Sequence, residues 1–299
     1  HEAVMAPTVA DRAGLMRAPQ ANLEPLLLAY RGEPDGDGAA EIIEKSITRT
    51  PLLTTTTEDG VRHRLWAVTD PAEIRTVSDA LAHRQALIAD GHHRWATYRL
   101  LRDERPSPSP AWDRGLVLLV DSVRYPLRVR AIHRVLYRLP VKTALNKLGG
   151  AFHIERIDGP LPAAMAALAE AARSGNAFVL AGDGSYHLLT RPDPELLAAA
   201  VPADRPASWR ALDATVLHSV LLSRVWNVPD SPDHIGYLHD TAAAEQQAML
   251  RGGTAVLMHP VEEGLVRTLA EQSVMMPRKS TSFGPKPATG LVLRDLTLD

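Results

Sequence analysis

The sequence predicts an α/β protein, and three observations indicate this fold class. Short apolar runs, bounded by Gly, Asp or Pro, alternate along the chain with segments of helical periodicity. Hydrophobic residues make up 45% of the 299 residues, enough for a substantial core, although only 5% are aromatic. A chain of this length is also long enough for two domains. We therefore expect two α/β domains, residues 1–140 and a smaller one at residues 141–299.

Local signals predict the elements of the first part of the chain. A helix is expected from about Ala10. The apolar end of residues 22–30 is typical of a buried strand, and the Gly- and Asp-rich residues 32–38 indicate a loop. Asp59-Gly60 favours a type I′ hairpin turn, in which both central residues have positive φ. The further expected elements are helices at 39–46 and 71–83 and strands at 52–57, 63–68 and 86–89.

The same alternation continues through the rest of the chain. Residues 105–110 are rich in Pro and Ser, which predicts an extended linker. Gly182 and Gly184 separate two apolar runs, which predicts a hairpin. The expected strands are 115–120, 128–137, 177–181, 186–190 and 255–259, and the expected helices are 162–174, 211–225, 241–251 and 261–272.

The composition excludes several classes of function. A formal net charge of −2 gives no general attraction to nucleic acid or to anionic membranes, and no apolar run is long enough to span a bilayer. The absence of cysteine excludes disulfides, thiolate catalysis and Cys-based metal sites. We expect a cytoplasmic protein that binds neither nucleic acid nor a membrane, and the sequence predicts no oligomeric state. The chain begins at His1 rather than Met, so we expect further sequence upstream.

The most informative segment is the turn at residues 90–94, which follows the apolar run at 86–89. A helix is expected over residues 95–104, so the turn lies at the positive end of that helix, where backbone N–H groups lack partners. Such a turn favours an anion, and Arg94 adds a planar set of donors suited to phosphate. This pattern predicts a phosphate-binding turn.

A structural interpretation of the same turn stays open. Asp90 can cap the helix, and Gly91 can supply a turn position with positive φ. His92 and His93 can be ordinary packing residues. Four polar residues in one turn are harder to explain by packing, because loops with such clusters tend to carry function.

A second candidate lies in a loop at residues 277–287. Lys279, Lys286 and the hydroxyls of Ser280 and Thr281 make this loop rich in donors for phosphate oxygens. The glycine spacing of a P-loop is absent. The alternative is a solvated basic turn, which is what charge runs usually are.

Two further clusters have weaker signals. Asp233, His234 and His239 include residue types that bind metal, but alternation in this segment fits a half-buried strand, which is the better interpretation. His133 and Arg134 stand in a β-branched, apolar context, so a paired core histidine is as good an explanation as a site. We find no nucleophile elbow, zinc-protease helix or dinucleotide fingerprint, and no protein metal site is predicted.

These motifs together resemble a bacterial and archaeal family known as domain of unknown function 1015, over nearly the full chain. The matching residues are His1-Glu2, Asp11-Arg12, Ala21-Asn22-Leu23, Ile88 to Arg94, Ile132-His133-Arg134, Leu212-Asp213, Asp233-His234-Ile235 and Lys279 to Lys286. The segments at 90–94 and 279–281 are the specific ones. Trp95 is a variant of the ring that usually follows the first segment, and residues 282–285 lack a ring pattern that is common in the family.

The segment at residues 90–94 is also similar to the phosphate-binding turn of the ParB/sulfiredoxin superfamily. This resemblance implies a ParB/sulfiredoxin-like core in the first domain and a loop of the second domain that returns to the cleft. Members of that superfamily include partition proteins, sulfiredoxin and free-serine kinases, which bind phosphates at this turn. In the kinases a carboxylate acts as base near the phosphates, a role for which Glu2 is the best candidate and Asp90 the second.

We therefore expect a phosphotransferase-like protein that binds a nucleotide or a phosphorylated small molecule, with magnesium as the one metal that a nucleotide would bring. The expected catalytic residues are Glu2, Asp90, His92 and His93; the expected phosphate-binding residues are Gly91, Arg94, Lys279, Ser280 and Thr281; the secondary candidates are Arg12, His133, Arg134 and Lys286. The alternatives are a nucleotide-binding switch without turnover and a metal-dependent hydrolase that uses Asp233, His234 and His239.

Overall fold

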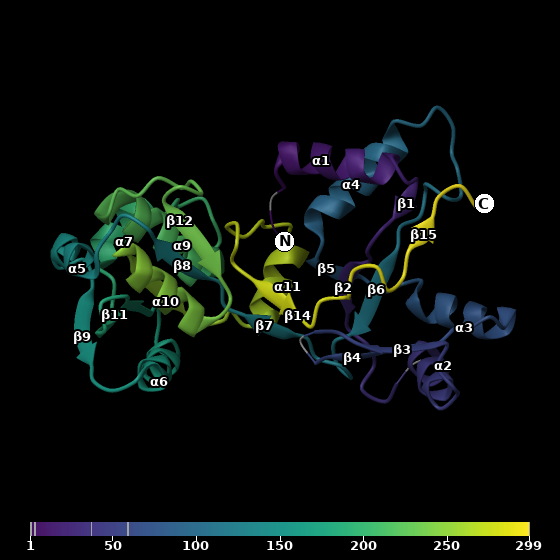
Figure 1. Ribbon diagram of the computed structural model, residues 1–299, viewed down its shortest axis with the longest axis horizontal. Helices are drawn as coiled ribbons and strands as arrows, with labels where there is room; N and C mark the ends of the chain where they lie inside the picture. Colours follow the sequence, from purple (N-terminus) through teal and green to yellow (C-terminus); the bar gives the residue numbers. More distant parts are fainter. Residues whose placement is uncertain (1, 3, 37, 59, 299) are drawn as a thin grey trace.

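The computed structural model describes residues 2, 4–36, 38–58 and 60–298, and two lobes make up the molecule (Figure 1). The fold class is mixed α/β, as the alternation of strands and helices predicts. None of the helices in the described part of the chain combines the length and apolar character needed to cross a bilayer.

A six-stranded sheet, in the order β12-β8-β13-β10-β11-β9, forms the centre of one lobe, and every neighbouring pair is antiparallel. Its strands are β8 (His133–Leu136), β9 (His153–Ile157), β10 (Phe178–Ala181), β11 (Tyr186–Thr190), β12 (Ile235–Leu238) and β13 (Thr254–Met258). The helices around it are α5 (Val141–Leu148), α6 (Leu161–Ala171), α7 (Pro194–Ala200), α8 (Ala207–Arg210), α9 (Asp213–Val216), the π-helix η1 (Leu217–Val225) and α10 (Thr241–Arg251).

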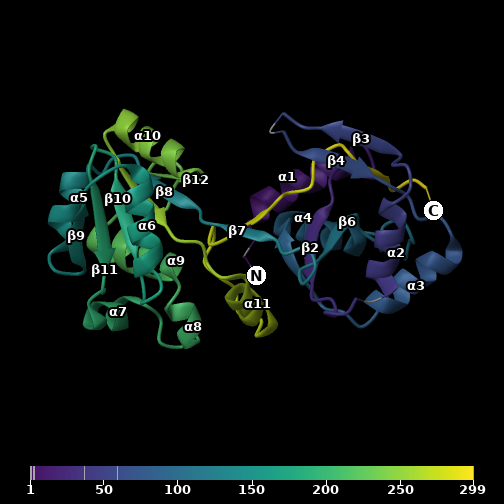
Figure 2. The ribbon, with the colours of Figure 1, turned by 90° about the horizontal axis from the view of Figure 1, so that it is seen from below.

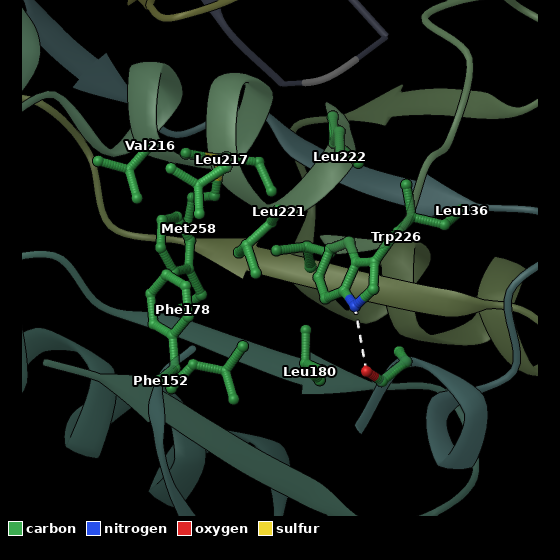
Figure 3. Close-up of a cluster of buried hydrophobic side chains, with 14 of the residues drawn as sticks. Leu136, Phe152, Phe178, Leu180, Val216, Leu217, Leu221, Leu222, Trp226 and Met258 are labelled. Atoms are coloured by element: carbon green, nitrogen blue, oxygen red, sulfur yellow. Dashed lines mark hydrogen bonds between the residues drawn. The ribbon is translucent and has the colours of Figure 1, made fainter. Parts of the chain in front are cut away.

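Both faces of this sheet are covered, which explains why its central strands are apolar throughout. Along β10, Phe178 and Leu180 point into one core, while Val179 and Ala181 point into the other. Figure 3 shows the first core, where the indole nitrogen of Trp226 donates to the backbone oxygen of Ala144 at 3.1 Å. In the second core, Ala and Leu residues of α6 and α10 pack on the other face of the sheet.

The other lobe contains a three-stranded sheet in the order β5-β2-β6. β2 (Leu26–Tyr30) pairs antiparallel with β5 (Ala86–Asp90) and parallel with β6 (Val117–Asp121). Two helices, α1 (Ala6–Arg17) and α4 (His92–Asp103), pack together through a small apolar cluster. An insertion between β2 and β5 carries α2 (Gly38–Ile47), the hairpin of β3 (Leu53–Thr56) and β4 (Arg62–Leu65), and α3 (Pro71–Leu81).

The narrow part between the lobes is formed by β7 (Arg128–Arg130), β14 (Ser282–Gly284) and α11 (Glu263–Glu271), as Figures 1 and 2 show. β7 pairs with β14, and the short strands β1 (Ala21–Asn22) and β15 (Arg294–Asp295) also pair. The C-terminal segment therefore runs back from the lobe of the six-stranded sheet to the lobe of the three-stranded sheet. The division into domains near residue 140 stays a prediction.

Several expected elements differ from the structure. The single strand expected at 128–137 is two strands, because β7 pairs with β14 while β8 joins the six-stranded sheet. The helix expected at 211–225 consists of α9 and the π-helix η1. The helix expected from residue 95 begins at His92, and that expected from residue 10 begins at Ala6. Asp59 of the predicted hairpin turn lies outside the described residues, while Gly60 has the expected positive φ of 80°.

Candidate functional site

Glu2, near the start of the chain, meets the segment 276–281 between the lobes (Figure 1). Glu2 forms an isolated parallel bridge with Met276. The hydroxyl of Thr281 donates to Glu2 Oε1 at 3.3 Å, and the backbone N–H of Thr281 also donates to this carboxylate. His1 lies outside the described residues.

Burial raises the pKa of the Glu2 carboxyl above its ordinary value. The hydrogen bonds from Thr281 and the positive charge of Lys279 act in the opposite direction, but they do not cancel the desolvation. A carboxylate with a raised pKa is a better proton acceptor at neutral pH. Glu2 is therefore suited to the role of general base.

Lys279 holds an unusual backbone conformation, with φ of 58°. Positive φ is costly for a residue other than glycine, and such positions cluster at functional sites. The backbone oxygen of Lys279 accepts a hydrogen bond from Arg134 Nη2 at 3.0 Å, which holds the segment in place. The side chain of Lys279 is exposed, and no carboxylate of the described residues pairs with it. Its charge acts on Glu2 and His93, so the three side chains lie near one another.

Arg134 is a fully buried cation in β8. It donates to the backbone oxygen of Ile132 and to the sulfur of Met258, and none of the described residues forms an ion pair with it. Its Nε has no hydrogen-bond partner in the described part of the chain. Burial lowers the pKa of Arg134 to about 10. A buried charge without a counter-ion is expensive, which favours an anion nearby.

His218 of η1 is a site residue that the sequence analysis missed. Its Nε2 lies 3.1 Å from Arg134 Nη2. Burial and the positive charge of Arg134 lower the pKa of His218 to about 4, so the ring is neutral at pH 7 and its Nε2 accepts from the arginine. π-Helical turns occur frequently at functional sites. No side-chain pattern in the sequence distinguishes such a turn from an ordinary helix.

The two predicted catalytic histidines are the first two residues of α4. Burial lowers the pKa of His92 to about 3, so this ring is neutral and cannot act as a proton donor near pH 7. His93 Nε2 accepts from the backbone N–H of Met5 at 3.1 Å. The pKa of His93 is also lowered, by burial and by the charges of Lys279 and Arg12. Both rings are therefore neutral at pH 7, and of the two His93 is the one that lies near Lys279.

Arg94 is held by acceptors of the protein. The guanidinium donates to Pro25 O and, at 2.7 Å, to Asp90 Oδ2, while its Nε lies 3.4 Å from Glu24. Asp90 also pairs with Lys286 Nζ at 2.7 Å. All three guanidinium nitrogens thus face protein acceptors; these contacts count against the phosphate-binding role that the sequence predicts for Arg94, which stays a prediction. These contacts indicate that Arg94 stabilises the turn. Asp90 lies between two cations, Arg94 and Lys286, which favour its ionised form and make it a weak proton acceptor.

Gly91 is required by the close approach of its neighbours. It caps α4 in the left-handed region, with φ of 98°. A Cβ at this position would lie 2.8 Å from the side chain of Leu26 and 3.1 Å from that of Arg94. The turn therefore depends on glycine for packing, whatever it binds.

The remaining predicted residues have structural contacts. Ser280 donates to Pro277 O at 2.5 Å, so its proton is already engaged. His133 Nδ1 accepts from the backbone N–H of Met258 at 3.1 Å, and burial lowers the pKa of His133 to about 4. His133 is therefore a hydrogen-bonded core histidine, one of the two interpretations that its apolar context favours.

The residues of the hydrolase hypothesis are not assembled. Asp233 and His234 precede β12 and His239 follows it, so the strand separates them. A four-residue strand spans more than 10 Å. Within the described residues, no group of three or more His, Asp or Glu side chains could hold a metal ion.

The structure thus brings together a cluster between the lobes. We call Glu2, His93, Arg134, Lys279 and Thr281 the inter-lobe cluster. It combines one carboxylate, two cations, a neutral imidazole and a hydroxyl. They come from the start of the chain, from α4, from β8 and from the segment before β14. This arrangement can neutralise an anion and accept a proton.

Comparisons with known proteins give a family and distant structural matches. A family model described as "Protein of unknown function (DUF1015)" matches residues 1–215, which confirms the family resemblance. No curated protein matches the chain. A free serine kinase in complex with AMP is similar over 99% of this chain and 88% of its own, with 14% identity and a TM-score of 0.45.

Two further solved structures are similar at the same level. SbnI with a C-terminal truncation from Staphylococcus aureus matches 100% of this chain and 85% of its own, with 10% identity and a TM-score of 0.47. A conserved hypothetical protein from Pyrococcus furiosus matches 97% of this chain and 89% of its own, with 13% identity and a TM-score of 0.44.

Proposed function

We propose that this chain, which belongs to the DUF1015 family, binds a nucleotide or another phosphorylated small molecule at the inter-lobe cluster and transfers a phosphoryl group. The observation that carries the proposal is the placement of Glu2, a carboxylate with a raised pKa, near two cations that form no salt bridge with any described carboxylate. A single part-buried carboxylate near two cations leaves room for an anionic ligand to balance their charge.

The chemistry of phosphoryl transfer matches these groups. The reaction asks a protein mainly to position its partners and to stabilise negative charge. Lys279 would contact phosphate oxygens directly, and the buried charge of Arg134 would add to the positive potential. Glu2 would accept the proton of the attacking hydroxyl. The Nε2 of the neutral His93 accepts from Met5, so its proton is on Nδ1, which would donate a hydrogen bond to a ligand oxygen.

Magnesium would arrive with the nucleotide, held mainly by phosphate oxygens and water, as this ion usually is. Bound there, magnesium would neutralise part of the negative charge of the phosphates. The described residues fit this limited role: they build no side-chain cage, and the Glu2 carboxylate lies close enough to Lys279 and Arg134 for their charges to interact. We infer no further step through the ion.

The test is a binding and transfer assay on the full chain. Nucleoside di- and triphosphates, with and without magnesium, should raise the melting temperature of the protein by mass action. Lys279→Met should abolish this shift, whereas Lys142→Met, an exposed lysine on α5, should retain it. Labelled nucleotide with a panel of hydroxyl compounds should yield a labelled product.

The outcomes separate the proposal from its alternative. A shift with transfer that Glu2→Gln removes supports the enzyme. A shift in the wild type without any transfer supports a nucleotide-binding switch. If no phosphorylated compound shifts the melting temperature, or if Lys279→Met behaves like Lys142→Met, the inter-lobe cluster is not a phosphate site.

A further inference from the structure

A separate cavity of about 270 Å³ lies between the lobe of the six-stranded sheet and α11. Its walls come from the end of α6, the start of α9, the segment that joins β13 to α11, and the C-terminal segment. Figure 2 shows α11 beside this lobe. Glu2, Lys279 and Arg134 are not among its lining residues, so it is distinct from the inter-lobe cluster.

One wall of the cavity is acidic. Asp213 lines it, and the amide nitrogen of Asn176 donates to Asp213 Oδ1 at 2.7 Å. The backbone N–H of Ala177 donates as well. A carboxylate can accept about four hydrogen bonds, so these two fix the orientation of Asp213 and leave acceptor capacity. Glu262 adds a second carboxylate to the lining.

The carboxylate of Asp213 is held in an unfavourable environment. Burial raises its pKa to about 6, although both hydrogen bonds and the nearby His259 lower it. The described residues form no ion pair with Asp213. The arginine in the lining, Arg173, pairs with Glu170 at 2.8 Å, and His259 is the other basic side chain there. Neither forms an ion pair with Asp213, so a ligand cation would supply the salt-bridge partner that Asp213 lacks among the described residues.

The rest of the cavity is apolar. Leu212, Val261, Leu265 and Met276 line it, and each also packs in or against the apolar cluster beneath α11. Pockets of this kind, apolar with a few convergent polar groups, are typical of small-molecule sites. The polar end would bind a charged head group, and the apolar walls would bury a short hydrocarbon chain.

We propose that this cavity binds a small organic cation, a primary ammonium group on a short aliphatic chain, with the ammonium on Asp213. The site exists independently of phosphoryl transfer. Ser280 lines the cavity, next to Lys279 and Thr281 in sequence, so a bound cation would contact the segment that carries the inter-lobe cluster. The ammonium group donates to a carboxylate in low-dielectric surroundings, where such bonds are strong.

The experiment is calorimetric titration of the full chain with butylammonium, in the absence of any nucleotide. 1-Butanol is the matched probe that has the same chain without the charge. We expect butylammonium to bind and butanol to bind at least about ten-fold more weakly, as loss of one charged hydrogen bond predicts. Equal binding of the two probes, or no binding of butylammonium at millimolar concentration, overturns the proposal.

Two variants locate the site. Asp213→Asn keeps the shape and removes the charge, and it should weaken butylammonium binding about ten-fold. Asp233→Asn, which changes a carboxylate on the same lobe outside this cavity, should have no effect. Should Asp213→Asn fail to fold, Ala172→Phe fills the cavity from the partly exposed end of α6 and should block the probe. Unchanged binding in the variant that folds contradicts the assignment.

Discussion

At the residue scale, the Glu2 carboxylate lies in a buried environment that disfavours its ionised form. Glu2 accepts two hydrogen bonds from Thr281, yet burial still raises its pKa. The folded state thus disfavours the ionised form relative to the unfolded chain. Stability contributed by the protonated form is present at low pH and is lost as the pH rises from the ordinary pKa of 4.5 through the raised value.

The first prediction follows from this sign. Glu2→Gln keeps an acceptor for Thr281 and removes the charge, so the variant should melt at a higher temperature than the wild type at pH 7. The difference should vanish below about pH 4, where both side chains are neutral. Phosphoryl transfer should fall about a hundred-fold or more, because the proton acceptor is gone. Melting curves at several pH values check this, and a variant that melts lower at pH 7 would contradict it.

The second prediction concerns Arg94, whose contacts with Pro25 and Asp90 stabilise the turn. Arg94→Ala removes the partner of Asp90 and of Pro25 O, so it should destabilise the fold by about 3 kcal/mol. Arg99→Ala changes an exposed arginine on the same helix and should stay within about 0.5 kcal/mol of wild type. Denaturant unfolding measures both. A stable Arg94→Ala protein that has lost nucleotide binding would restore Arg94 as a ligand.

At the element scale, the site depends on how η1 and β8 hold the C-terminal segment. His218 of η1 accepts from Arg134 of β8, and Arg134 in turn donates to the backbone of Lys279. This chain of hydrogen bonds supports a positive φ that a lysine would otherwise avoid. His218 is therefore a positioning residue.

The third prediction tests this role. His218→Ala should raise the rate of amide hydrogen exchange at residues 279–281, because the segment loses part of its support. Nucleotide affinity should fall about three- to ten-fold, as loss of one hydrogen bond predicts. His153→Ala, on the exposed edge strand β9, is the control. Unchanged exchange at 279–281 would mean that His218 does not support the segment.

The elements show what the sequence could predict. Runs buried on both faces, such as β10 and β13, and helices with clear ends, such as α3 and α10, were predicted within a few residues. The split between β7 and β8 could not be predicted, because strand pairing decides it rather than local composition. The same limit applies to Arg94: sequence identifies a donor at a helix start, but only tertiary contacts show which acceptors already occupy it.

At the scale of the whole molecule, the inter-lobe cluster contains two cations, although the charges of the chain nearly balance. The formal net charge is −2, so the chain as a whole attracts no anions, and attraction of a phosphate would rest on local groups such as Lys279. The cluster takes His93 from the lobe of the three-stranded sheet and Arg134 from the lobe of the six-stranded sheet, while Glu2 and the C-terminal segment lie between them. A ligand at this cluster would therefore depend on how the two lobes are placed.

The fourth prediction follows from this local charge. Raising ionic strength from about 0.05 M to about 0.5 M should weaken nucleotide binding several-fold, since salt screens the exposed Lys279. Lys279→Met should remove most of this salt dependence, whereas Lys142→Met should not. Titration calorimetry at the two ionic strengths gives both values. Salt-independent binding by the wild type would contradict an electrostatic site.

The most direct test of the central claim is the position of the phosphates in a crystal of the full chain grown with ADP and magnesium. We predict phosphate oxygens within hydrogen-bond distance of Lys279 Nζ, about 3 Å, on the side of the C-terminal segment that faces Glu2. Phosphates bound elsewhere on the chain, or no nucleotide at saturating concentration, would contradict the account.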